Sequence, residues 1–163
     1  MIKKDEDIRR FTCDDMTITE VIRRALADNL VRIPYANEGG FIATELSEDG
    51  TDDTQLIHIT GFYAVDGLMM QQVTVIYFDT LSRANRFLSS PEGRLFDDEY
   101  SNGQDCFDYT TYAGNPLLPF LIATILRNHF GFKESSPLDA YTYCNVDYFR
   151  KDPDEIPKQR LKS

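Results

Sequence analysis

The densest group of reactive side chains is an acidic loop between two strand-like segments. Its carboxylates are Glu48, Asp49, Asp52 and Asp53. Several carboxylates on a flexible loop are the ligands that Ca²⁺ prefers. The spacing is not that of an EF-hand, however, and no glutamate stands at the twelfth position of the loop. We therefore predict no metal site here and interpret the loop as a charged, solvated connection.

Cysteine and histidine are too sparse to indicate a metal centre or a local nucleophile. These residues are Cys13, Cys106, Cys144, His58 and His129. Zinc sites need such ligands at close spacing, and none occurs here. An odd number of thiols without C-x-x-C spacing argues against a disulfide framework and for reduced thiols in a cytoplasmic protein. A thiol and an imidazole could still meet in space, which only a structure decides.

Motifs for nucleotide binding and acid–base catalysis are also missing from the sequence. It contains neither G-x-x-x-x-G-K-[ST] nor G-x-G-x-x-G. Carboxylates are so abundant that choosing two of them as an acid and a base would be arbitrary. We therefore predict no catalytic residue, no cofactor and a protein that is not an enzyme.

Negative charge is concentrated in the middle of the chain. The net charge is −10, and residues 33–126 hold 14 acids and 3 bases, or −11. Such a surface disfavours direct binding to nucleic-acid phosphates and to anionic membranes. The longest apolar run, residues 117–126, is shorter than the ~18–20 residues that cross a bilayer. The charged N-terminus lacks the apolar region of a secretory signal. We expect a protein partner with a basic surface.

Tyrosine is concentrated in the last third of the chain. Six of the nine tyrosines fall between Tyr100 and Tyr148. Tyrosine is enriched at protein interfaces because it offers a large contact area and a polar tip. The candidates for binding a partner are Tyr141, Tyr143 and Tyr148. An equally weighted alternative is a tyrosine-lined sheet face that packs inside the domain.

The elements that must position these residues begin with a helix over residues 17–30. Thr17 and Glu20 fit a capping box, and Met16 and Val21 occupy the two positions of a hydrophobic staple. Apolar residues then recur at helical spacing along the segment, so we expect one buried helical face.

Three strand-like runs follow, at residues 41–46, 56–63 and 72–78. Their connections are short, and the second contains Asp66-Gly67, which is a turn signal. Short connections require antiparallel neighbours, so the pattern predicts a three-stranded meander. A second helix is predicted to begin at Asp79 or Thr80.

A hairpin is predicted over residues 94–100 and 105–112. Asn102-Gly103 between alternating segments is the strongest short-range hairpin signal. A third helix over residues 117–130 follows, and it is apolar on nearly all sides. Beyond it, residues 141–149 form either an additional strand or an extended arm.

Together these elements predict a single α+β domain over residues 1–150, with a flexible tail at 151–163. The predicted order is α-β-β-β-α-β-β-α, with an antiparallel sheet of about five strands and an extra C-terminal strand as an option. Asn115 would cap the third helix, Pro116 would take its first position, and Gly131 would end it.

This order of elements, from Thr17 to Phe130, resembles that of the type III secretion chaperone-like superfamily, including YbjN-type proteins. The resemblance concerns element order and a small, acidic chain, not motif residues. It implies an α+β sandwich, dimerisation through the second helix or the sheet, and a role in holding another polypeptide. A likeness of fold does not fix function.

The leading hypothesis is a non-enzymatic, acidic protein-binding module, chaperone-like or inhibitory, that holds or masks a partner protein. An acidic face would steer a basic partner. Its candidate residues are Glu48, Asp49, Asp52, Asp53, Asp97, Asp98 and Glu99. The alternatives are a phage or plasmid anti-defence inhibitor that imitates nucleic acid, and a toxin-immunity protein. Rows of carboxylates at a duplex-like pitch would favour imitation.

Overall fold

The computed structural model describes residues 9–12, 16–36, 40–48, 55–64, 69–101 and 104–144. Within these residues, seven strands form one sheet in the order β1-β7-β2-β3-β4-β6-β5. The strands are β1 (Arg9–Phe11), β2 (Phe41–Ser47), β3 (Gln55–Tyr63), β4 (Met70–Tyr77), β5 (Asp97–Ser101), β6 (Gln104–Tyr112) and β7 (Asp139–Cys144). The helices are α2 (Ile18–Arg32), α3 (Leu81–Leu88) and α4 (Leu118–Phe130), with 3-10 turns η1 (Ile33–Tyr35) and η3 (Gly93–Leu95).

Every pair of neighbouring strands is antiparallel, which confirms the predicted α+β class. The meander β2-β3-β4 and the hairpin β5-β6 form as predicted. The segment after the last helix is a strand rather than an arm, and β7 lies between β1 and β2. Strand β5 begins later than predicted because η3 takes up residues 93–95 first.

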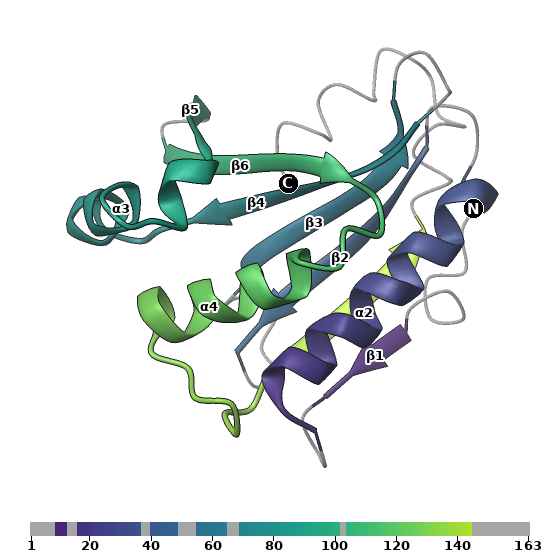
Figure 1. Cartoon of the computed structure of the whole chain (residues 1–163), viewed down its shortest axis with the longest axis horizontal. Helices are drawn as coiled ribbons and strands as arrows, with labels where there is room; N and C mark the ends of the chain where they lie inside the picture. Colours follow the sequence, from purple (N-terminus) through teal and green to yellow (C-terminus); the bar gives the residue numbers. More distant parts are fainter. Residues whose placement is uncertain are drawn as a thin grey trace.

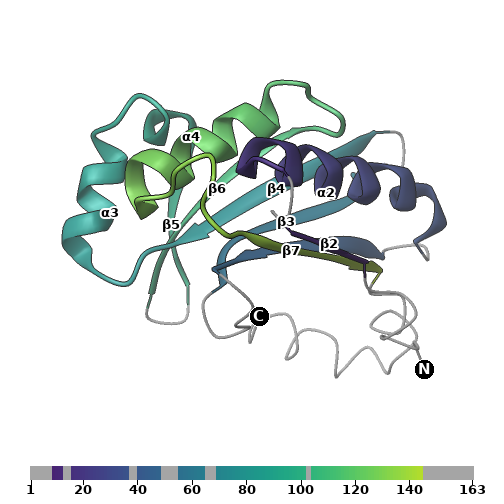
Figure 2. The same cartoon turned by 90° about the horizontal axis from the view of Figure 1, so that it is seen from below.

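The helices cover one face of the sheet (Figures 1 and 2). Figure 2 shows α2 and α4 as a layer above the strands, whereas no helix of the described part lies below them. The buried face of the sheet supplies Ile57, Ile59, Ile76 and Phe107, each at most 1% exposed. Burying such side chains is the main stabilising contribution to the domain. In this part of the chain, no helix is long and apolar enough to span a membrane.

Helix α2 begins at the predicted cap, which Glu134 in the loop between α4 and β7 reinforces. The Thr17 hydroxyl accepts the backbone N–H of Glu20 at 3.2 Å. The Glu134 carbonyl accepts the N–H of Ile18 at 2.9 Å, and its carboxylate accepts the Thr19 hydroxyl at 2.8 Å. The Glu20 carboxylate pairs with arginines of its own helix, so only the threonine half of the predicted capping box is observed.

A buried amide network fixes α2 on the sheet. Asn29 Nδ2 donates to the carbonyl of Ile42 at 3.2 Å and to Thr44 Oγ1 at 3.0 Å. Its Oδ1 accepts from Gln72 Nε2 at 3.0 Å. Neither Asn29 nor Thr44 is exposed at all, and Gln72 is 1% exposed. Because buried polar groups are costly when unpaired, these bonds select one position of the helix over β2 and β4.

Helix α4 ends at a glycine, as the sequence predicts. Gly131 has φ 74°, a left-handed conformation that glycine adopts without steric cost. At the other end, Asn115 Oδ1 accepts the N–H of Leu117 at 3.0 Å, so the asparagine caps a turn and the helix proper starts at Leu118. Arg83 of α3 donates to the His129 carbonyl at 2.7 Å and so links α3 to the end of α4.

Candidate binding surface and pocket

The face of the sheet turned away from α2 and α4, hereafter the open sheet face, carries an unusual set of side chains. Strand alternation and register place seven of them there: Thr60, Phe62, Val73, Val75, Tyr77, Thr110 and Tyr112. Thr110 and Tyr112 are exposed, and the other five are half-buried. An antiparallel sheet with one solvated face normally presents polar residues on it. Here β4 presents Val73, Val75 and Tyr77 beside the polar Gln71.

Two carboxylates lie opposite each other at the β5 edge of this face. Asp97 pairs with Asp108 across the β5-β6 ladder, and Asp108 pairs with Val75 of β4. Side chains of directly opposed residues are close, so two like charges there destabilise the sheet. Among the described residues, no group of three or more potential metal ligands occurs. The pair therefore gives the edge a negative field without forming a recognisable cation site.

The other side of the open sheet face holds a cluster of titratable side chains on β7, β2 and β3. The Tyr143 hydroxyl donates to Glu45 Oε1 at 3.3 Å, and His58 Nδ1 lies 3.9 Å from the same oxygen. Burial lowers the pKa of His58 to about 4 despite the nearby carboxylate. Burial, and then the negative Glu45, raise the pKa of Tyr143. At neutral pH the imidazole of His58 is therefore uncharged.

The predicted tyrosines lie on this same face, in part. Tyr141 and Tyr143 are half-buried on β7, where Tyr141 pairs with Glu45 across the ladder. Their role in binding a partner stays a prediction. Tyr148 and Cys13 lie outside the described residues.

The predicted acidic residues do not form one continuous surface in the described part of the chain. Glu48, Asp97 and Asp98 are exposed, but Asp97 and Asp98 are consecutive in β5 and point to opposite sides. Strands β2 and β5 are four strand spacings apart, or about 19 Å. Glu48, just after β2, is thus far from the pair in β5. Asp49, Asp52, Asp53 and the side chain of Glu99 lie outside the description.

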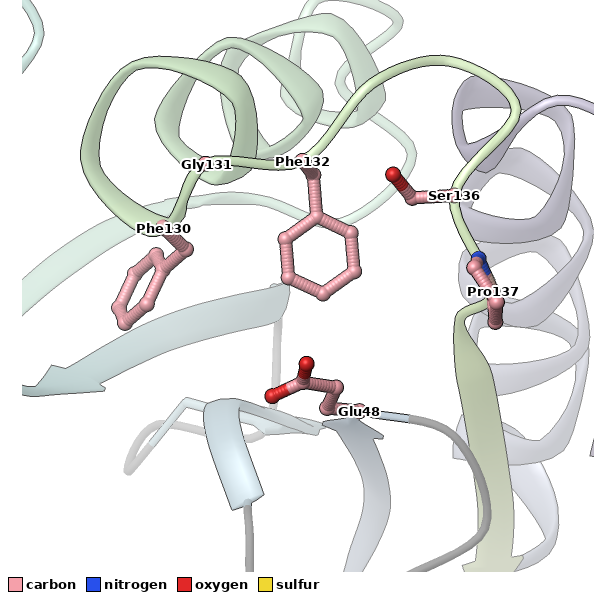
Figure 3. A pocket seen from close by; sticks show the side chains of 6 residues that line it. All are labelled: Glu48, Phe130, Gly131, Phe132, Ser136 and Pro137. Carbon is pink, nitrogen blue, oxygen red and sulfur yellow. The ribbon is translucent and has the colours of Figure 1, made fainter.

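A small pocket lies where β2 ends beneath the C-terminus of α4 (Figure 3). Its volume is about 180 Å³, and its lining comprises Glu48, Phe130, Gly131, Phe132, Ser136 and Pro137. Figure 3 shows the Glu48 carboxylate pointing toward the rings of Phe130 and Phe132. We call it the Glu48 pocket. Sequence reasoning identified Glu48 but missed the aromatic walls, whose only local signal is a phenylalanine on each side of the helix-ending glycine.

A buried pair of side chains, His129 and Glu92, joins the end of α4 to the segment just before η3. His129 Nε2 lies 3.1 Å from Glu92 Oε2, and the same oxygen accepts from Asn128 at 3.0 Å. Burial raises the pKa of Glu92, but the hydrogen bonds from Asn128 and His129 outweigh it and leave that pKa lowered. The imidazole packs edge-on against the ring of Phe87 at 5.1 Å.

Cys106 does not join this pair. Cys106 faces the open side of the sheet, since it pairs with Tyr77, whereas His129 lies in the helix layer. The thiol–imidazole alternative is therefore not realised for these two residues. The open sheet face and the Glu48 pocket are the candidate sites. Comparison with protein-family models, with curated proteins and with solved structures finds no match to this chain.

Proposed function

We propose that this protein binds another protein through the open sheet face, without catalysis. The observation that carries the proposal is the apolar character of this helix-free face, above all the row Val73, Val75 and Tyr77 on β4. Contiguous exposed apolar side chains mark interaction sites on soluble domains. Tyrosines at its margins, such as Tyr112 at 55% exposure, are the residue type that anchors interfaces.

The charge on this face selects the partner. Glu45, Asp97 and Asp108 are carboxylates on it, and His58 is neutral at pH 7 because its pKa is about 4. A partner with an apolar centre and lysine or arginine at its rim is complementary to such a surface. A second copy of this chain would set like charges against each other. We therefore favour a basic heterologous partner over the homodimer that the family resemblance implies.

The side chains of the open sheet face also favour protein binding over imitation of nucleic acid. An imitator needs carboxylates at regular phosphate-like spacing. On the open sheet face, the described carboxylates at Glu45 and Asp108 are separated by His58 and Val75 along the row that crosses the strands. The intervening side chains suit a protein interface better. A holding or masking role, as the resemblance implies, is consistent with binding through one broad face.

The test replaces one valine of the face and compares it with a valine elsewhere. Val73→Arg places a charge in the centre of the open sheet face, while Val31→Arg makes the same change on α2, at a side chain that is 60% exposed. A partner captured from the native host is purified, and its affinity for each variant is measured by titration calorimetry at low and high salt. Equal thermal unfolding of the two variants controls for misfolding.

Val73→Arg is expected to weaken binding at least about tenfold, whereas Val31→Arg changes it less than about twofold. Affinity is also expected to fall as salt rises, because the partner is basic. Equal affinities for the two variants would refute binding through this face. Affinity that is independent of salt would refute the basic partner.

A further inference from the structure

We propose that the outer edge of β5 binds an extended, basic segment of a partner protein, which adds to the sheet as a further strand. The unpaired backbone groups of this edge, the regular pairing of β5 and the charge of its side chains support the assignment. The edge lies beyond β6, whereas the valine row of the open sheet face lies on β4. This inference and the proposed function can therefore fail separately.

In the described part of the chain, the backbone of β5 is paired on one side only. Strand β5 is the last in the order of the sheet, and all of its residue pairs are with β6. Outside the ladders and the helices, no backbone hydrogen bond among the described residues involves Asp97–Ser101. An edge strand with unpaired N–H and C=O groups is a template on which a strand of another chain can form.

The register of the hairpin identifies the backbone groups that point outward. Ser101 pairs with Gln104 across a connection of two residues. In such a hairpin the closing pair is a hydrogen-bonded pair, and hydrogen-bonded and non-hydrogen-bonded pairs then alternate along the ladder. The N–H and C=O groups of Asp98 and Tyr100 therefore point away from β6. These two residues offer up to four hydrogen bonds to an added strand.

The usual devices that block an exposed sheet edge are missing from β5. Native proteins protect edges with proline, lysine, a bulge or a very short strand. Strand β5 contains neither proline nor lysine, and it pairs with β6 over five residue pairs without a register shift. The opposite edge of the sheet, β1, is only three residues long and carries Arg9 and Arg10. Of the two edges, β5 is therefore the one suited to accept a basic strand.

The charge of β5 selects the strand that can be added. Asp97 and Asp98 are both exposed, and as consecutive residues of a strand they project to opposite faces of the sheet. An added strand therefore meets a carboxylate on each face. Opposite charges on neighbouring strands attract each other, whereas like charges repel. Pairing of two copies through β5 would bring acidic strands together. The complementary occupant is a segment of another protein with lysine or arginine at successive positions.

The experiment measures amide hydrogen exchange by NMR on the full chain at low salt. The probe is a blocked heptapeptide of threonine and valine with two central lysines. One control peptide has glutamates in place of the lysines, and a second has both lysine backbone nitrogens methylated, which keeps the charge but prevents strand pairing. In the free chain, the amides of Asp98 and Tyr100 should exchange faster than that of Glu99, which bonds to β6. Equal protection of the three would show that the edge is already occupied and would overturn the proposal.

The lysine peptide is expected to bind with a dissociation constant of about 1 mM or lower. At a peptide concentration ten times this constant, exchange at Asp98 and Tyr100 should slow about tenfold, because only the unbound edge exchanges. Neither control peptide should give this protection. Its absence with the lysine peptide, or equal protection by either control peptide, would contradict strand addition by a basic segment.

Two variants of one residue separate backbone pairing from charge. Asp98→Val removes the carboxylate and keeps the outward N–H, and it is expected to weaken the lysine peptide about threefold. Asp98→Pro also removes the N–H, at an edge position that tolerates proline, and should weaken it at least about tenfold. Equal affinities of these two variants would refute strand pairing, and the methylated peptide tests the same point on the unchanged protein. Val73→Arg should change the affinity less than about twofold; loss of binding in this variant would place the peptide on the open sheet face and overturn the edge site.

Discussion

Replacing Gly61 of β3 by alanine tests the packing of α2 on the sheet. A Cβ atom at this position would lie 2.1 Å from Asn29 Oδ1 and 2.9 Å from Ile33 Cδ1. Both neighbours are fully buried, and Asn29 is held by the amide network. Neither can move away without breaking hydrogen bonds or displacing the helix, so the glycine is required by this close approach.

The expected loss of stability follows from two contributions. Overpacking a closely packed core costs about 1–3 kcal/mol. Displacing Asn29 leaves buried amide groups without partners, which costs about 1–3 kcal/mol more. Alanine also lowers the conformational entropy of the unfolded chain, which stabilises the folded protein by only about 0.4–1 kcal/mol. We therefore expect Gly61→Ala to lower the free energy of unfolding by about 1–5.5 kcal/mol, measured by urea unfolding.

Far-ultraviolet circular dichroism is the suitable signal, because the chain contains no tryptophan. Gly131→Ala is the matched control. A Cβ there meets nothing within 4 Å, so only the left-handed φ of 74° opposes it. That conformation costs an alanine about 1–2 kcal/mol. Gly61→Ala should therefore be clearly the more destabilising of the two glycine variants.

A double-mutant cycle with Asn29→Ala identifies the cause. This second change removes Oδ1, the atom nearest to the new methyl group. Gly61→Ala should then cost at least about 1 kcal/mol less in the Asn29→Ala background than in the wild type. Additive effects, or a Gly61→Ala cost no larger than that of Gly131→Ala, would refute the reasoning.

Three further predictions concern titration and charge. The pKa of His58 is about 4 in the folded protein and 6.5 in the unfolded chain, so the unfolded chain binds a proton first as the pH falls. The free energy of unfolding should therefore fall by about 3 kcal/mol between pH 6.5 and pH 4. His58→Gln should remove this part of the pH dependence of urea unfolding. Burial raises the pKa of Glu134, but bonds from Thr19 and Arg127 outweigh it, so its folded pKa lies below 4.5. Its contribution is present above pH 4.5 and is lost as pH falls through the folded value. Glu134→Gln should therefore destabilise the protein at pH 7 and progressively less as the pH is lowered below 4.5, as measured by thermal unfolding. Asp97→Asn should raise the unfolding free energy by a few tenths of a kcal/mol, more at low salt, since it relieves repulsion from Asp108; a destabilised variant would contradict this.

Elements with local signals could be predicted from the sequence. The Thr17 cap, the pairing of β5 with β6 and the Gly131 helix end each depend on a few neighbouring residues and their backbone preferences. Periodicity then indicates which side of each element is buried. The meander could be predicted as well, because short connections leave only antiparallel neighbours.

Contacts between distant segments could not be predicted in this way. The cap that Glu134 places on α2 spans 115 residues, and no local pattern marks it. The close approach of the Asn29 side chain to Gly61 depends on how α2 crosses β3, and sequence periodicity does not determine that crossing. The candidate sites have the same origin. The open sheet face exists because α2 and α4 lie on one side, and the Glu48 pocket because two loops meet.

The place of β7 has a consequence for the order in which the protein can assemble. This strand is the last of the sheet in sequence, yet its backbone pairs with β1 on one side and with β2 on the other. During synthesis, β2, β3 and β4 can pair as soon as they emerge, but the exposed edge of β2 waits for residues 139–144. Pairings over such sequence distances are slow to form. A nascent chain that stops short of Asp139 therefore displays an unpaired strand edge, the feature by which incomplete β-sheet proteins aggregate.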